Sequence, residues 1–171
     1  MHSIALWPTC IVLIIAAATD IRSRRIPNWL VVPFLASGII WSGITGGLEG
    51  AAQSVTGISI AVGVLGVLCY LRGMGMGDLK LCAGVGAWVG PAQMISALVA
   101  TAIAGGFLAM AYSLWHRSLG KCLDDTGDLV VALCRDGVRP QPTMRLDNPD
   151  AVKLPYAVAI AIGTLFSFYA R

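Results

Sequence analysis

Two aspartates stand apart from the other acidic residues of this sequence. Of the nine acids, six lie in one polar stretch, residues 116–151, and Glu49 lies in a short turn. The remaining two, Asp20 and Asp78, each stand at one end of an apolar run. An ionisable side chain at membrane depth costs several kcal/mol unless a function or a partner retains it. Asp20 and Asp78 are therefore the first candidates for chemistry.

Two carboxyl groups that share one site can carry out acid–base hydrolysis. Because they cannot both ionise easily, one keeps its proton and the other becomes a base. The base would activate water against a peptide carbonyl, while the protonated partner polarises that carbonyl and later protonates the leaving amine. Structural alternatives stay open: Asp78 could cap a helix, and Asp20 could lie at the interface, paired with the arginines that follow it.

The glycines around Asp78 favour a functional role for it. Residues 73–77 (GMGMG) form a poor helix, so we expect unwound backbone there. A cap needs neither Gly75 nor Gly77, whereas backbone that approaches a substrate does, since glycine lacks Cβ and allows positive φ. Unwound backbone at membrane depth must be satisfied by protein or water, which predicts a hydrated cavity. Packing alone remains the alternative for both glycines.

The composition says which solvent surrounds these residues. The chain is 57% hydrophobic and 12% charged, against about 25% charged in soluble domains. We therefore expect one integral membrane domain over residues 1–171. The net charge of +3 and the lack of a basic, aromatic-rich run argue against nucleic acid. The five cysteines contain no CxxC pair, so neither a zinc site nor a disulfide framework is expected, and no metal or cofactor is predicted.

Apolar runs predict an all-α, polytopic bundle of about six transmembrane helices. They lie at about 3–19, 29–47, 51–71, 79–90, 92–115 and 152–170. The run 79–90 is short, because it ends at Gly90-Pro91 and covers only about 18 Å of a hydrocarbon core about 30 Å thick. If Pro91 marks the far surface, this helix begins inside the membrane, at Asp78.

Basic residues predict the orientation of the bundle. The links at 20–28, 72–80 and 116–153 carry three, two and six of the twelve lysines and arginines. The positive-inside rule places these links in the cytoplasm and both termini outside, so both aspartates face the cytoplasm. The 116–151 segment reads as a cytoplasmic loop whose first half could form a short interfacial helix, while prolines break the second half.

Other proteolytic chemistries lack their motifs. There is no His-Glu-x-x-His for a zinc protease. Ser42-Gly43 follows Ile40-Trp41, so the Gly-x-Ser-Gly of a serine intramembrane protease is missing. The glycines before Asp78 lack the Gly-Lys-Ser/Thr of a phosphate loop. Among proteolytic mechanisms, the aspartyl one remains.

Three stretches resemble the type IV prepilin peptidases, which are aspartyl membrane proteases of the GxGD type. Residues 75–80 (GMGDLK) resemble the family's Gly-x-Gly-Asp-x-Lys signature. Residues 20–28 (DIRSRRIPN) resemble its second segment, an aspartate followed six residues on by Ile-Pro-Asn. Residues 153–163 (KLPYAVAIAIG) are similar to its final helix. The matches stand in the expected order and span most of the chain.

The resemblance implies that Asp20 and Asp78 form the catalytic pair of an aspartic-type endopeptidase. Its substrate would be a prepilin-like protein with a short basic leader before an apolar helix, cleaved at the cytoplasmic face of the bacterial inner membrane. The residues expected to support the pair are Gly75, Gly77, Lys80, Pro27 and Asn28.

The supporting residues have structural alternatives. Pro27 fixes φ and could start the following helix as its N1 residue. Lys80 could fix the position of Asp78 or simply anchor the chain on the inner side. Tyr156 with Pro155 could be an interfacial anchor.

Departures from the family refine the expectation. Larger members carry an amino-terminal region with CxxC pairs that is linked to N-methylation; none precedes Asp20, so we expect cleavage without methyl transfer. The compact size resembles the branch that serves Flp, or tight-adherence, pili.

The expected partners are a prepilin and membrane lipid, and the oligomeric state is not specified. Two rivals stay open: a proton-coupled transporter component that uses the same aspartates, and a non-catalytic pilus-assembly scaffold.

Overall fold

The chain folds into a bundle of α-helices. The computed structural model describes residues 2–23, 25–70, 74–115 and 156–169, and no strand occurs among them. The helices are α1 (His2–Ser23), α2 (Asn28–Tyr70), α3 (Met76–Trp115) and α5 (Tyr156–Tyr169). The predicted loop at 116–151, with its short interfacial helix, lies outside the described residues. The all-α prediction is confirmed.

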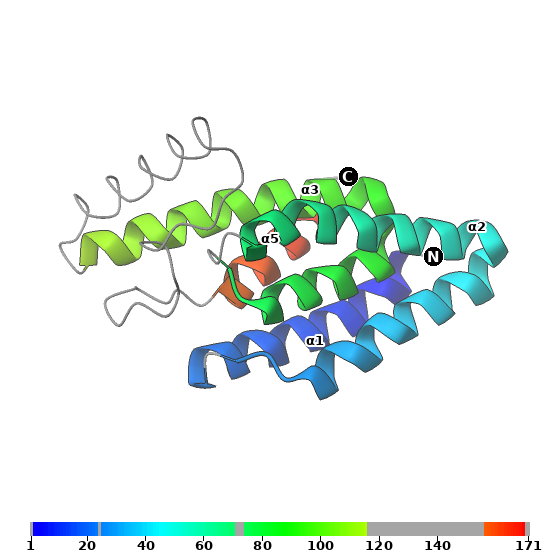
Figure 1. Cartoon of the computed structure of the whole chain (residues 1–171), viewed down its shortest axis with the longest axis horizontal. Coiled ribbons are helices and arrows are strands. Elements are labelled where there is room, and N and C mark those ends of the chain that lie inside the picture. Colours follow the sequence, from blue (N-terminus) through cyan, green and yellow to red (C-terminus); the bar gives the residue numbers. More distant parts are fainter. Residues whose placement is uncertain (1, 24, 71–73, 116–155, 170–171) are drawn as a thin grey trace.

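The number of helices differs from the prediction, because the described residues form four and not six. α2 and α3 each contain one glycine with a positive φ, Gly47 (61°) and Gly90 (75°), and the helix resumes directly after it. Only glycine adopts such a backbone without strain. Each long helix therefore folds back on itself as two antiparallel arms (Figure 1), and no separate loop divides the arms.

The first arm of α3, residues 76–89, is the centre of the bundle. Every residue from 81 to 87 is buried, as expected of a helix that is apolar on all sides. The two arms of α2 flank it, since Ser42 Oγ and Ser54 Oγ, one from each arm, donate hydrogen bonds of 3.3 and 2.9 Å to the Ala87 carbonyl. Its expected shortness is confirmed by the kink at Gly90.

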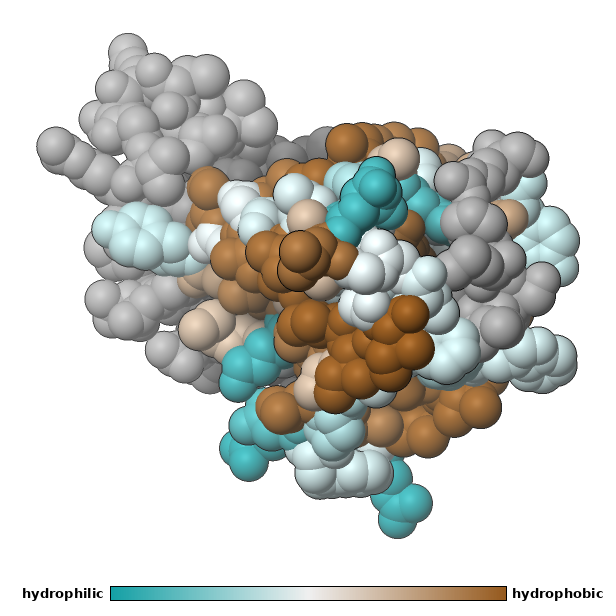
Figure 2. Space-filling model, turned by 90° about the vertical axis from the view of Figure 1, so that its right-hand side faces the viewer, coloured by the Kyte–Doolittle hydropathy of each residue, from teal (hydrophilic) through white to brown (hydrophobic). Residues whose placement is uncertain are grey.

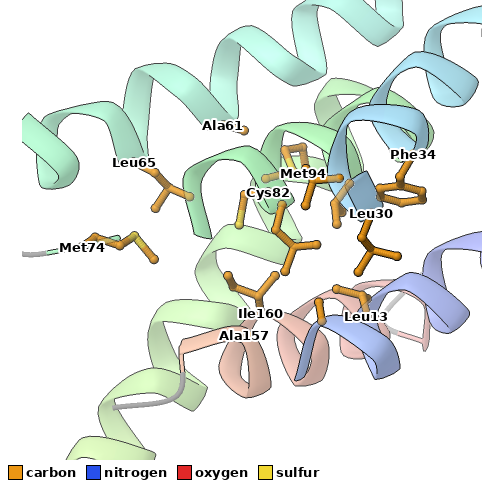
Figure 3. Close-up of a cluster of buried hydrophobic side chains, with 14 residues drawn as sticks. Leu13, Leu30, Phe34, Ala61, Leu65, Met74, Cys82, Met94, Ala157 and Ile160 are labelled. Atoms are coloured by element: carbon orange, nitrogen blue, oxygen red, sulfur yellow. The ribbon is translucent and has the colours of Figure 1, made fainter. Parts of the chain in front are cut away.

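Small residues allow this close packing, as is usual between membrane helices. A Cβ built on Gly86 would lie only 2.7 Å from the carbonyl carbon of Gly57. On the other side, Phe34 covers Gly84 and its ring stacks on that of Trp88, with ring centroids 5.9 Å apart. The core around this arm draws on all four helices and Met74 (Figure 3): Leu13, Leu30, Phe34, Ala61, Leu65, Met74, Cys82, Met94, Ala157 and Ile160.

The outer surface suits lipid as the solvent. α1, α2 and α3 are each long and apolar enough to cross a membrane, and α5 is a shorter apolar helix. Large hydrophobic side chains are exposed on all four helices, for example Trp7, Ile44, Phe107 and Phe166. Hydrophobic residues also gather over the middle of the end of the bundle shown in Figure 2, with hydrophilic ones mostly around them. These features fit an integral membrane protein.

Candidate functional site

The bundle brings Asp20 and Asp78 to the same end. Asp20 lies in the last turn of α1 and Asp78 in the first turn of α3, and these helix ends lie on the left in Figure 1. Asp20 is 8% exposed and Asp78 is 9% exposed, and among the described residues they are the only charged side chains that are buried. The pair that the sequence singled out is therefore buried at one end of the bundle.

Gly75 lies against the Asp78 carboxylate at the start of α3. A Cβ at this position would lie 3.1 Å from Asp78 Oδ2, so the lack of a side chain leaves room for the carboxylate. The Gly75 carbonyl accepts hydrogen bonds from the Leu79 N–H (3.4 Å) and from Cys69 Sγ (3.6 Å). Cys69 lies at the end of α2, so Gly75 contacts both α2 and α3 and also lies beside the Asp78 carboxylate.

The glycines act through close contacts. The prediction that residues 73–77 are unwound is wrong at its end, because α3 begins at Met76 and Gly77 is helical. Neither Gly75 nor Gly77 has a positive φ. Instead, Ile26 packs on Gly77, where a Cβ would meet Ile26 Cβ at 3.2 Å. The absence of a side chain lets the segment before α2 lie directly on the first turn of α3.

Asn28 and Lys80 join the same two segments. Lys80 Nζ donates a hydrogen bond of 3.1 Å to Asn28 Oδ1, so the lysine has a partner other than the aspartates. Pro27 lies just before α2, and its carbonyl accepts the first helical hydrogen bonds, from the N–H groups of Leu30 (3.1 Å) and Val31 (3.4 Å). Pro27 is therefore the N-cap and not the predicted N1 residue.

Asp20 has a partner that the sequence did not suggest. The backbone N–H of Ala157, in the first turn of α5, donates a hydrogen bond of 3.2 Å to Asp20 Oδ2. Arg22 and Arg25 are exposed. The residue type at position 157 does not show that its backbone N–H donates to a carboxylate. The only sequence signal for this contact was Pro155-Tyr156, which indicates that a helix starts there. Cys69 and Ile26 were also missed, because each contacts the site through a glycine.

The electrostatics of the site come from two helix N-termini. Asp78 lies in the first turn of α3 and Asp20 accepts from the first turn of α5, and a helix N-terminus carries partial positive charge that stabilises carboxylates. Such a site can hold one ionised and one protonated carboxyl group side by side. Among the described residues, no group of three or more His, Cys, Asp or Glu side chains is arranged to hold a metal ion.

Comparison with known proteins identifies the family. A model described as the type IV leader peptidase family matches residues 7–110, which include both aspartates. The chain belongs to the type IV leader peptidase family.

Curated relatives of this leader peptidase family member are named "Prepilin leader peptidase/N-methyltransferase". The chain is 29% identical over 119 residues to the one from Burkholderia pseudomallei, with 63% of this chain and 37% of the relative covered. It is 30% identical over 118 residues to the one from Escherichia coli, with 64% and 52% covered. The chain thus spans between about a third and a half of the length of these relatives. No solved structure gives a significant match.

Proposed function

We propose that this chain is an aspartic-type membrane endopeptidase that removes the leader peptide from a prepilin-like protein. Membership in the type IV leader peptidase family and the curated names of its relatives support a prepilin-processing peptidase. The observation that carries the aspartic mechanism is the pair of carboxyl groups, Asp20 and Asp78, that are buried at the same end of the bundle. Burial of two acids costs several kcal/mol, which is a reason to expect that they are used.

The mechanism follows from the chemistry of a shared proton. One carboxylate takes a proton from water, which attacks the carbonyl carbon of the scissile peptide bond. The other carboxyl group donates a hydrogen bond to the carbonyl oxygen and then a proton to the leaving amine. The proton taken from water stays on the first carboxyl group, so the pair again holds one proton after product release, and its transfer between the two carboxyl groups restores the starting state. The partial positive charge at the starts of α3 and α5 offsets the negative charge that develops on the attacked carbonyl.

The substrate and the orientation are part of the proposal. A short basic leader would be removed at the cytoplasmic face of a bacterial inner membrane, with the apolar helix of the prepilin held in lipid. The basic links at 20–28 and 72–80 support a cytoplasmic site. A substrate of the Flp type, cleavage without N-methylation and a hydrated cavity at the pair stay predictions.

The family relationship favours the peptidase over both rivals. A proton-coupled transporter that relays protons through Asp20 and Asp78 has no support from the relatives, which are named as peptidases. A scaffold for pilus assembly would work with asparagine at both positions, because asparagine keeps the size and most of the hydrogen bonds of aspartate. Catalysis by a proton shared between two carboxyl groups would not work with asparagine at these positions.

The test is leader removal in cells that express a leader-bearing pilin together with the wild type, Asp20→Asn or Asp78→Asn. Glu49→Gln is the matched control, since Glu49 is an exposed acid in α2 beside the Gly47 turn. We expect the leader mass to be lost with the wild type and the control and retained with both aspartate variants, all four proteins being present in the membrane. Complete processing by either aspartate variant would remove that residue from the mechanism.

A further inference from the structure

The two helices that carry the aspartates hardly touch one another. α1 packs mainly against α5, with only slight contact to α2 and α3, while α5 packs along much of α3. The position of Asp20 relative to Asp78 therefore depends on α5, a helix that carries neither aspartate and lies beyond the residues that match the family model.

α5 is firmly seated on the second arm of α3. A Cβ on Gly163 would lie only 2.6 Å from Thr101 Cα, so the two backbones are in direct contact at this level. Towards the end of α5, Gln93 Nε2 donates a hydrogen bond of 3.4 Å to the Ser167 carbonyl. The close approach at Gly163 and the hydrogen bond at Ser167 lie at two different positions along α5. Together they restrict both the sideways movement of α5 and its movement along its own axis.

At its other end, α5 is attached to Asp20. Ala157 is fully buried and Asp20 is 8% exposed, and the Ala157 N–H donates to Asp20 Oδ2 at 3.2 Å. The first N–H groups of a helix have no partner within it, so Asp20 acts as an N-cap supplied by another helix. A hydrogen bond to a carboxylate is stronger than one between neutral groups, and it restricts the rotation of the aspartate side chain.

We propose that α5 is the positioning element of the catalytic pair, and that the backbone N–H of Ala157 is the contact that aims the Asp20 carboxyl group at the site it shares with Asp78. This inference rests on the proposed peptidase function. It assigns no chemistry to α5: Ala157 holds a reacting group and does not touch the substrate. The rate of cleavage should therefore depend on one backbone hydrogen atom, while substrate affinity should not.

The direct test removes that hydrogen and leaves the side chain unchanged. An ester replaces the peptide bond when Ala157 is substituted by lactic acid in cell-free synthesis, Ala157→lactate. The same change at the next residue, with the hydroxy-acid analogue of valine at Val158, is the matched control. Both proteins are placed in lipid nanodiscs with a synthetic peptide that carries a basic leader and the start of an apolar helix.

We expect the ester at 157 to lower kcat about tenfold to a hundredfold, as for the loss of one hydrogen bond to a charged group, with KM changed less than about threefold. The ester at 158 should retain kcat within about threefold. Equal rates for the 157 ester and the wild type, or equal losses at 157 and 158, would overturn the inference. A wild type that does not cleave would contradict the proposed function instead.

A stability measurement separates positioning from general helix damage. In the wild-type background the 157 ester should lower the thermal midpoint, and in an Asp20→Ala background the same ester should cost little, because the acceptor is already gone. Losses of equal size in both backgrounds would show that the Ala157 N–H does not act through Asp20, and would overturn the inference whatever the cleavage rates are.

Discussion

Gly75→Ala should slow cleavage without unfolding the protein. The added Cβ would lie 3.1 Å from Asp78 Oδ2 and would meet no other atom within 4 Å. Ordinary contact begins at about 3.4 Å, so the carboxylate must move by a few tenths of an ångström. That movement displaces a carboxyl group of the proposed catalytic pair. Because a misplaced reacting group loses rate steeply, we expect a loss of about tenfold in kcat, which corresponds to about 1.4 kcal/mol.

The assay is kcat for leader cleavage by purified protein in nanodiscs, measured together with the thermal midpoint. Gly63→Ala is the control, because a Cβ on this exposed residue of α2 meets nothing within 4 Å. We expect the control to keep the wild-type rate and Gly75→Ala to lose rate at a nearly unchanged midpoint, since alanine also restricts the unfolded chain. A folded Gly75→Ala protein with wild-type kcat would refute the reasoning that Gly75 controls the Asp78 carboxylate.

Two further predictions concern the packing around the site. Gly86→Ala should lower the free energy of unfolding by about 1–3 kcal/mol, because its Cβ would lie 2.7 Å from the Gly57 carbonyl carbon; chemical denaturation checks this against Gly63→Ala, and an unchanged midpoint would contradict the tight contact. Lys80→Ala and Asn28→Ala should each lower kcat about two- to tenfold, and the double variant should be no slower than the slower single one, since one hydrogen bond joins the two side chains. Losses that multiply would show that they act separately.

The sequence singled out Asp20 and Asp78 because charge is expensive in lipid. Few acids lie outside the polar segment 116–151, so these two aspartates became the candidates, and the basic links indicated that both stand at one end. The packing of α1, α3 and α5 agrees with this. The short central helix was equally predictable, since Gly90-Pro91 ends its first arm.

The structural role of each glycine could not be predicted in the same way. A glycine can serve a positive φ or a close contact, and the residue type does not say which. Gly47 and Gly90 use the first property. Each of them joins two helices that the sequence predicted as separate, so that the pair forms the two arms of α2 or of α3. Gly75 and Gly77 use the second, against Asp78 and Ile26.

The contact of α5 with Asp20 could not be predicted from the sequence, for a different reason. Its contact with Asp20 comes from the backbone N–H of Ala157, and every residue except proline has such a group. Only the three-dimensional packing tells which one faces a carboxylate. Residue patterns therefore located the two acids but not the element that sets their relative position.

The central claim is that Asp20 and Asp78 work as one unit, and a double-mutant cycle on kcat tests it most directly. Single-turnover cleavage of a leader-bearing peptide is measured for the wild type, Asp20→Asn, Asp78→Asn and the double variant. Groups that act together lose their effect together, so we predict that each single variant is as slow as the double variant. Near-wild-type cleavage by either single variant, or two partial losses that multiply in the double variant, would contradict a shared catalytic site.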